Sequence, residues 1–255
     1  MLKMGCVACR TIKSRLFIIC VLFMAVLNFT SICYVNEYGR QYSVIETVFM
    51  ENYKEVVLMN GVSWDSLWRQ PLGTYVAMFA PVVSIFPFLN RFWNEKMSGY
   101  ILFVESRVGR KKYLIMQIVD AWISSGLVVM LGTLVFDVSL VLLFYGSGGA
   151  VERYGLIVSC VEKSALLFLY GAVIGTPSLL LSACLKNRYV ISCIPFALIY
   201  LYDLVVGRWE GNGFSSLSLT YAFQLPNACA VIIGHMGIGI VLSLGFFVIM
   251  NRRIR

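Results

Sequence analysis

Charged residues are what this sequence has least of. Only 13% of its 255 residues are Asp, Glu, Lys or Arg, it contains one histidine, and 59% of it is hydrophobic. A soluble domain averages roughly 25% charged and about 45–50% apolar residues. The shortage of charge therefore argues against a water-soluble domain and indicates a membrane protein.

The sequence also lacks the short motifs that mark common catalytic sites. It contains no G-x-x-x-x-G-K-[ST] and so has no P-loop of its own for ATP, and it contains no H-E-x-x-H and no G-x-S-x-G. Cys6 and Cys9 form a C-x-x-C pair, but a zinc site needs about four ligands and no second pair follows. We therefore expect a chain that is not an enzyme and that holds no cofactor or metal.

Long apolar runs, in contrast, are abundant. A membrane's hydrocarbon core of about 30 Å needs roughly 20 helical residues, and these runs are too long for barrel strands of about 10 residues. Six runs are long enough to be spans, and we keep the first as a retained anchor because no signal-peptide cleavage site follows it. They lie at about 14–34, 72–89, 113–136, 164–184, 189–206 and 230–250. We predict an all-α polytopic membrane protein with six transmembrane helices in one domain, 1–255.

The distribution of Lys and Arg predicts the orientation. Most of the 21 Lys and Arg residues fall in the N-terminal tail, the segment 90–112, the turn before residue 189 and the C-terminus. Cytoplasmic segments are the ones enriched in Lys and Arg. We therefore expect both termini in the cytoplasm, a multi-pass protein of the plasma membrane, and outside loops at 36–70 and 207–229. Topology accounts for the net charge of +8, so no nucleic-acid partner is expected.

The two outside loops have apolar stretches of their own. In the first, Ile45, Phe49, Val56 and Met59 recur at near-helical spacing, which predicts an amphipathic helix. In the second, "FSSLSLTYAFQLP" is aromatic and apolar but too short to span, so we expect a re-entrant or interfacial segment.

Few ionisable residues lie within the spans. Asp120 and Asp137 fall near opposite ends of the third span, and His235 falls near the outer end of the sixth. An ion relay needs several acids at mid-depth, and the spans do not supply them. We interpret all three as interfacial or packing residues, and their functional role stays open.

Proline and glycine are placed where helices bend or pack closely. The prolines are expected to interrupt their spans, and the two glycines form a G-x-x-x-G that lets helices approach closely. The positions are Pro81 and Pro87 in the second span, Gly171, Gly175 and Pro177 in the fourth, and Pro195 in the fifth.

The segment 90–112 reads as a short surface helix. On a helical wheel from Glu95 to Val108, one side is apolar and the other carries Gly99, Ser106 and Arg107, and a glycine then ends the helix. A basic turn of Arg110, Lys111 and Lys112 follows and can anchor at the lipid headgroups. From these residues alone, a basic cytoplasmic loop without a partner remains an equal alternative.

This segment resembles the cytoplasmic segment between spans two and three of type 2 ABC exporter permeases. Glu95 and Gly99 match that family's Glu and the Gly four residues later, and "ILFVESRVGRKKYLIMQ" resembles its helix, basic turn and next span. The six-span layout resembles the family over nearly the whole chain, whereas the motif covers about 25 residues. Tyr100 to Phe103 replace the family's Thr/Leu-rich continuation.

The resemblance implies the membrane-spanning permease subunit of an ATP-driven ABC exporter. Such a subunit pairs with a second permease subunit and docks separate ATPase subunits, which bind ATP and Mg and drive export of a hydrophobic or amphipathic cargo. It implies a short cytoplasmic coupling helix whose ATPase-coupling interface would comprise Glu95, Gly99, Glu105, Arg107 and Arg110. The alternative is a non-ABC six-span membrane protein such as a sensor, assembly factor or small channel, and a membrane enzyme ranks third.

Overall fold

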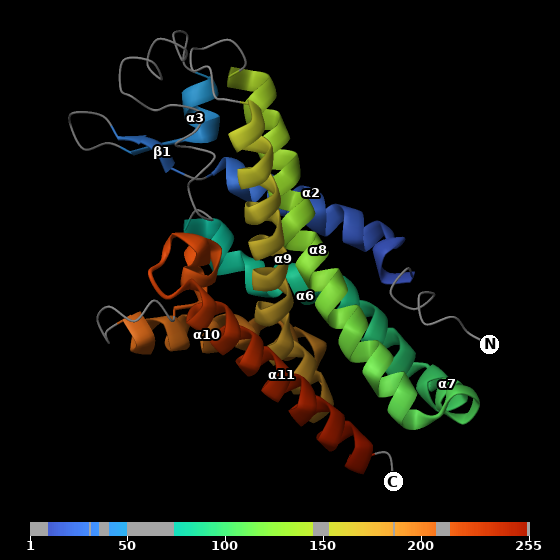
Figure 1. Cartoon of the computed structure of the whole chain (residues 1–255). Helices are drawn as coiled ribbons and strands as arrows, with labels where there is room; N and C mark the ends of the chain where they lie inside the picture. The colour runs from blue at the N-terminus through green and yellow to red at the C-terminus, as the bar shows by residue number, and fades with distance from the viewer. Residues whose placement is uncertain are drawn as a thin grey trace.

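The computed structural model describes residues 10–30, 32–35, 41–49, 74–144, 153–185, 187–207 and 215–253. These residues form an almost entirely helical structure (Figure 1). Its long helices are α2 (Arg15–Phe29), α6 (Thr74–Met97), α8 (Arg110–Phe144), α9 (Arg153–Cys184), α10 (Arg188–Gly207) and α11 (Ala228–Arg253). The shorter elements are strands β1 (Ile32–Val35) and β2 (Gln41–Ser43), helices α3 (Val44–Val48) and α7 (Tyr100–Val108), and the 3-10 helix η1 (Ser216–Gln224).

Five of the helices are long and apolar enough to cross a membrane, which agrees with an all-α membrane protein. The segments that meet this criterion are Tyr75–Met97, Arg110–Leu140, Val161–Cys184, Tyr189–Val206 and Ala228–Arg252. They coincide with five of the six predicted spans, but α6, α8 and α9 each extend beyond the predicted limits by a turn or more.

The first predicted span is shorter than expected. Helix α2 has 15 residues, which is about 22 Å of helix at 1.5 Å per residue and less than the hydrocarbon thickness. Ser14 caps its start by accepting a hydrogen bond from the Phe17 N–H at 3.2 Å. At its end the Thr30 hydroxyl donates to the Leu27 carbonyl at 2.6 Å, and the chain then enters β1. Local side-chain bonds therefore end this helix before the apolar run ends.

Helices α8 and α9 lie side by side through the middle of the structure (Figure 1). Both glycines of the G-x-x-x-G motif face this contact. A Cβ on Gly171 would lie 2.7 Å from the Ser125 carbonyl oxygen, and a Cβ on Gly175 would lie 2.9 Å from the Ser125 hydroxyl. The two backbones approach so closely because neither glycine has a side chain.

The prolines do not end the helices that contain them, and their expected role in helix bending stays a prediction. Pro81 and Pro87 lie inside α6, Pro177 inside α9 and Pro195 inside α10, and each helix continues on both sides. In a membrane helix, neighbouring helices and side chains can compensate for the backbone bond that a proline removes.

The predicted outside loops are structured in part. Strand β1 occupies the end of the first predicted span and pairs antiparallel with β2 of the first outside loop, with Tyr34 opposite Tyr42. Neither strand was predicted from the sequence. Ile45 lies in the short helix α3, whereas Val56 and Met59 lie outside the described residues, as do Cys6 and Cys9. The apolar segment of the second loop forms η1, which packs against α9, α10 and α11.

Burial is uneven among the five long candidate spans. More than half of each apolar segment is buried in α6, α8 and α9, but only 17% of that in α10 and 22% of that in α11 is buried. The core accordingly lies around α8 and α9. Its largest fully buried side chains include Tyr170 near the centre, and Phe88, Phe92 and Phe246 toward the end where α7 lies.

Candidate functional site

Two glycines separate α7 from the helices on either side of it. Gly99 has φ +70° between α6 and α7, and Gly109 has φ +85° between α7 and α8. Residues with side chains rarely adopt such angles, so glycine permits both sharp joints. The predicted segment 90–112 is therefore not one element. Its first residues belong to α6, its last to α8, and only the nine residues of α7 form the separate surface helix.

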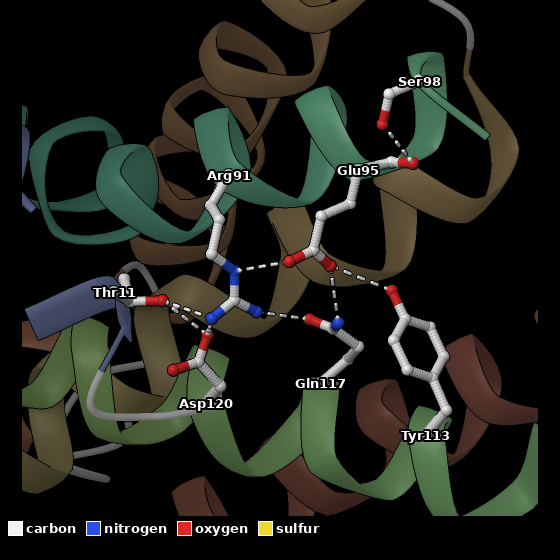
Figure 2. A network of polar contacts seen from close by, with 7 residues as sticks. All are labelled: Thr11, Arg91, Glu95, Ser98, Tyr113, Gln117 and Asp120. Atoms are coloured by element: carbon white, nitrogen blue, oxygen red, sulfur yellow. Dashed lines mark hydrogen bonds and ion pairs between the residues drawn. The ribbon is translucent and has the colours of Figure 1, made fainter. Parts of the chain in front are cut away.

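A network of buried polar side chains lies beside α7, with Arg91 at its centre (Figure 2). The Arg91 Nη1 is 2.7 Å from the Asp120 Oδ2 and donates to the Thr11 hydroxyl at 2.6 Å. Its Nη2 donates to the Gln117 Oε1 at 2.7 Å, and its Nε is 3.5 Å from the Glu95 Oε1. The Thr11 hydroxyl also donates to Asp120 at 2.8 Å. One guanidinium thus faces two carboxylates.

Glu95 is turned into this network. It is 9% exposed, and its Oε2 accepts hydrogen bonds from the Tyr113 hydroxyl and the Gln117 amide, both at 3.1 Å. Its backbone carbonyl accepts a bond from the Ser98 hydroxyl at 3.3 Å. The family resemblance implied that Glu95 touches a partner subunit, but in this structure its carboxylate contacts α6 and α8 instead (Figure 2).

Helical spacing explains how the network assembles. Arg91 and Glu95 are four residues apart on α6 and share a face, and Tyr113, Gln117 and Asp120 share a face of α8. Four of the network's members were missed from the sequence: Thr11, Arg91, Tyr113 and Gln117. The spacing along α6 and α8 was a usable signal for three of them. Nothing in the sequence indicated that the turn holding Thr11 folds against α8.

Helix α7 buries one side and exposes an aromatic and cationic one. Ile101 is buried, whereas Leu102 is 63% and Phe103 is 51% exposed. The Arg107 guanidinium lies 4.2 Å from the centre of the Phe103 ring, and the Phe103 and Tyr100 rings lie 6.1 Å apart. Cation–π and ring contacts hold these side chains together on the surface.

Two cations tie the joints of α7 to the ends of other helices. The Lys96 Nζ donates to the Ser182 carbonyl at 3.1 Å, in the last turn of α9. The Arg110 Nη2 donates to the Met250 carbonyl at 2.7 Å, in the last turn of α11. Cations are favourable at helix C-termini, where carbonyls lack partners within the helix. Arg110, implied as a docking residue, is thus bonded within this chain.

The remaining predicted contact residues occupy the rim of α7. Glu105 is partly buried, and its Oε1 has no hydrogen-bond partner among the residues that the structure describes. Lys111 and Lys112 are exposed at the start of α8. Their contact with lipid headgroups stays a prediction.

The ionisable residues far from α7 are paired or packed. Asp137 is buried and bonds to the Lys163 Nζ at 2.9 Å, which joins α8 to α9. His235 is buried, with its Nδ1 2.8 Å from the Val231 carbonyl and its Nε2 3.1 Å from the Ser215 carbonyl. Within the described ranges, no three His, Cys, Asp or Glu side chains are placed to hold a metal ion.

Comparison with protein-family models, curated proteins and solved structures finds no match for this chain. The structural class of this protein is therefore assigned from its own sequence and structure. The residues that the structure describes are mainly helical and include five helices long and apolar enough to cross a membrane. At one end the protein has a buried charged network beside an exposed short helix, which is the candidate site for contact with a partner.

Proposed function

We propose that this chain is the membrane-spanning permease subunit of an ATP-driven ABC exporter in the plasma membrane. Support comes from the resemblance of residues 94–116 to the coupling segment of such permeases and from the apolar helices. In this proposal both termini and α7 face the cytoplasm. ATP and Mg bind in partner ATPase subunits, and a second permease subunit, the same or different, completes the pathway for a hydrophobic or amphipathic cargo.

The observation that carries the proposal is the exposed surface of α7, made of Leu102, Phe103 and Arg107. Buried aromatic and arginine side chains supply much of the binding free energy in protein interfaces, so this surface suits insertion into a groove of an ATPase subunit. Glu105 lies on the same helix, but its Oε1 is buried, so it does not add to this exposed surface.

The contacts around α7 suit a transmission role. Lys96 and Arg110 connect its two joints to α9 and α11, and the Arg91 network connects α6 to α8. A displacement of α7 by a closing ATPase would therefore be passed to four long helices together. In this proposal Glu95 and Arg110 act as positioning residues within the permease, and Phe103 and Arg107 make the contact.

The test is co-purification of the chain with a P-loop ATPase, followed by measurement of their affinity and of ATP turnover. Phe103→Ala and Arg107→Ala are each expected to cost about 2 kcal/mol of binding, the size of an interface hot spot. That corresponds to roughly thirtyfold weaker assembly. Phe79→Ala is the matched control, because Phe79 is an exposed phenylalanine of α6 far from α7.

Unchanged assembly and turnover in both α7 variants would contradict the proposal. That result would favour the alternative, a six-span protein such as a sensor, assembly factor or small channel, in which α7 is a basic loop segment without a partner.

A further inference from the structure

A cavity of about 240 Å³ lies between α9, α10, α11 and η1. Each of the four elements contributes to its wall, with Pro177 from α9, Leu198 from α10, Leu219 from η1 and Leu242 from α11. An apolar cavity of about 150 Å³ in a protein core stays dry and accepts a guest the size of benzene. This larger cavity therefore has room for an apolar guest rather than for water.

The wall of the cavity is almost wholly apolar. His235 is part of it, but both of its ring nitrogens lie against backbone carbonyls, those of Val231 and Ser215. A polar ligand would give up its bonds to water here and gain few in return, which is costly. The chemistry of the wall therefore selects plain hydrocarbon.

Beside the cavity lies the boundary between α10 and α11, which we call the seam. Helices α10 and α11 both pack against α9 and η1, but they make little contact with each other in the described structure. The outward faces of both helices carry exposed apolar side chains, including Leu201 and Leu204 on α10 and Ile240 and Val241 on α11. If these helices cross a membrane, as their length and composition allow, hydrocarbon chains surround this seam.

Element η1 forms part of the cavity wall. It packs against α9, α10 and α11, and its Leu219 lines the cavity and is 1% exposed. The contact of His235 with the Ser215 carbonyl joins α11 to the residue that caps η1. A guest therefore has its path sideways, through the seam, rather than along the helices through η1.

We propose that this cavity binds one acyl chain of a bilayer phospholipid, which enters between α10 and α11. The phospholipid is the hydrocarbon-bearing molecule that a membrane supplies at this seam. The bound chain fills space that side chains leave empty and bridges two helices that scarcely touch. This site lies within one chain and needs no ATPase and no second permease subunit, so it stands or falls separately from the exporter proposal.

The test uses the full chain in phosphatidylcholine nanodiscs that contain a phosphatidylcholine with a diazirine in one acyl chain. After illumination, mass spectrometry maps the labelled residues. We expect labelling of a buried cavity residue, Leu219, which is 1% exposed and out of reach of the surrounding bilayer. Leu242→Trp, which fills the cavity, is expected to abolish this labelling. Val241→Trp, on the exposed face of the same helix, is the matched control and is expected to keep it.

Because a tryptophan in the wall can overpack the core, Leu242→Ala provides a second arm. This variant enlarges the cavity and is expected to retain the label at the buried Leu219. A parallel sample with a free fatty acid that carries the same diazirine tests the source of the chain. Labelling confined to outward residues such as Leu201, equal labelling of Leu242→Trp and wild type, or labelling by the fatty acid alone would each overturn the proposal.

Discussion

Arg91 has more polar partners than any other side chain in the network of Figure 2. Burying a charge is costly unless it is paired and hydrogen-bonded, and here one guanidinium pairs with two buried carboxylates, those of Glu95 and Asp120. Lysine could not reproduce this arrangement, because its ammonium lacks the planar fork that lets arginine bond several groups at fixed angles. The network therefore depends on this residue type as well as on its charge.

Arg91→Leu is expected to lower the free energy of unfolding by about 3–5 kcal/mol, because it leaves two buried carboxylates without their cation. Chemical denaturation of the detergent-solubilised protein measures this change. The triple variant Arg91→Leu, Glu95→Gln, Asp120→Asn removes the unpaired charges and is expected to recover much of the loss. Equal stability of Arg91→Leu and wild type would show that the network is not a source of stability. No recovery in the triple variant would show that the unpaired carboxylates are not the cause of the loss.

At the scale of elements, the contact between α8 and α9 is set by residues that lack side chains. Gly171 lies against the backbone of α8, near Ser125 and Gly126. In a membrane, helices do not gain from hiding apolar side chains from each other, so close backbone packing is a main source of attraction. The G-x-x-x-G spacing thus corresponds to the close backbone contact between α8 and α9.

Gly171→Ala is expected to lower the free energy of unfolding by about 1–3 kcal/mol, because the new Cβ would press on a backbone oxygen that cannot move alone. Gly237→Ala in α11 is the control. A Cβ there meets nothing within 4 Å, so this change is expected to be neutral or to stabilise the helix by about 0.5–1 kcal/mol. Denaturation of the two variants side by side measures the difference, and equal stability would contradict the packing role of Gly171.

The joints of α7 are a second feature of this scale. Gly99 and Gly109 let the chain turn out of α6 and into α8 with a nine-residue helix between them. Since Lys96 and Arg110 bond to the ends of α9 and α11, the short helix is held at both sides while one face stays exposed. The backbone angles that the two glycines permit, together with the hydrogen bonds from Lys96 and Arg110 to the ends of α9 and α11, therefore fix the position of α7.

On the scale of the whole molecule, the described parts of the N-terminal region and of α11 both contact the α7 end. Thr11 bonds to Asp120 near α7, and the Met250 carbonyl bonds to Arg110. The N-terminal region and the end of α11 lie on the same side of a membrane only if the chain crosses it an even number of times. Whether that number is even depends on whether the 15-residue helix α2 crosses.

Reporter fusions test this topology. Alkaline phosphatase folds only outside the cytoplasm, so a fusion after Ser43 is expected to be active and a fusion after Met250 inactive. Green fluorescent protein at the same two positions is expected to give the reverse pattern. An inactive phosphatase after Ser43 would show that α2 does not cross the membrane, and an active one after Met250 would reverse the predicted orientation.

The sequence predicted some features well and others not at all. The segments 189–206 and 230–250 agree with α10 and α11 to within a few residues, because apolar runs between polar flanks are local signals. The inward turn of Glu95 was not predicted. Whether a carboxylate at the end of a helix faces water or a neighbour depends on the face that the neighbour presents, and periodicity within one segment does not contain that information.

The sequence by itself determined that the chain is helical and apolar enough for a membrane, and it marked Gly109 as the end of a short helix. It placed Gly99 inside that helix, and only the structure showed the break there. Only the tertiary structure decided that Arg91 joins Glu95 to Asp120, that Thr11 closes the network, and that α10 and α11 leave an apolar cavity between them. The physical reason is the range of the interactions. Hydrophobic length and backbone freedom act within a few residues, whereas buried charges and cavities arise where distant helices meet.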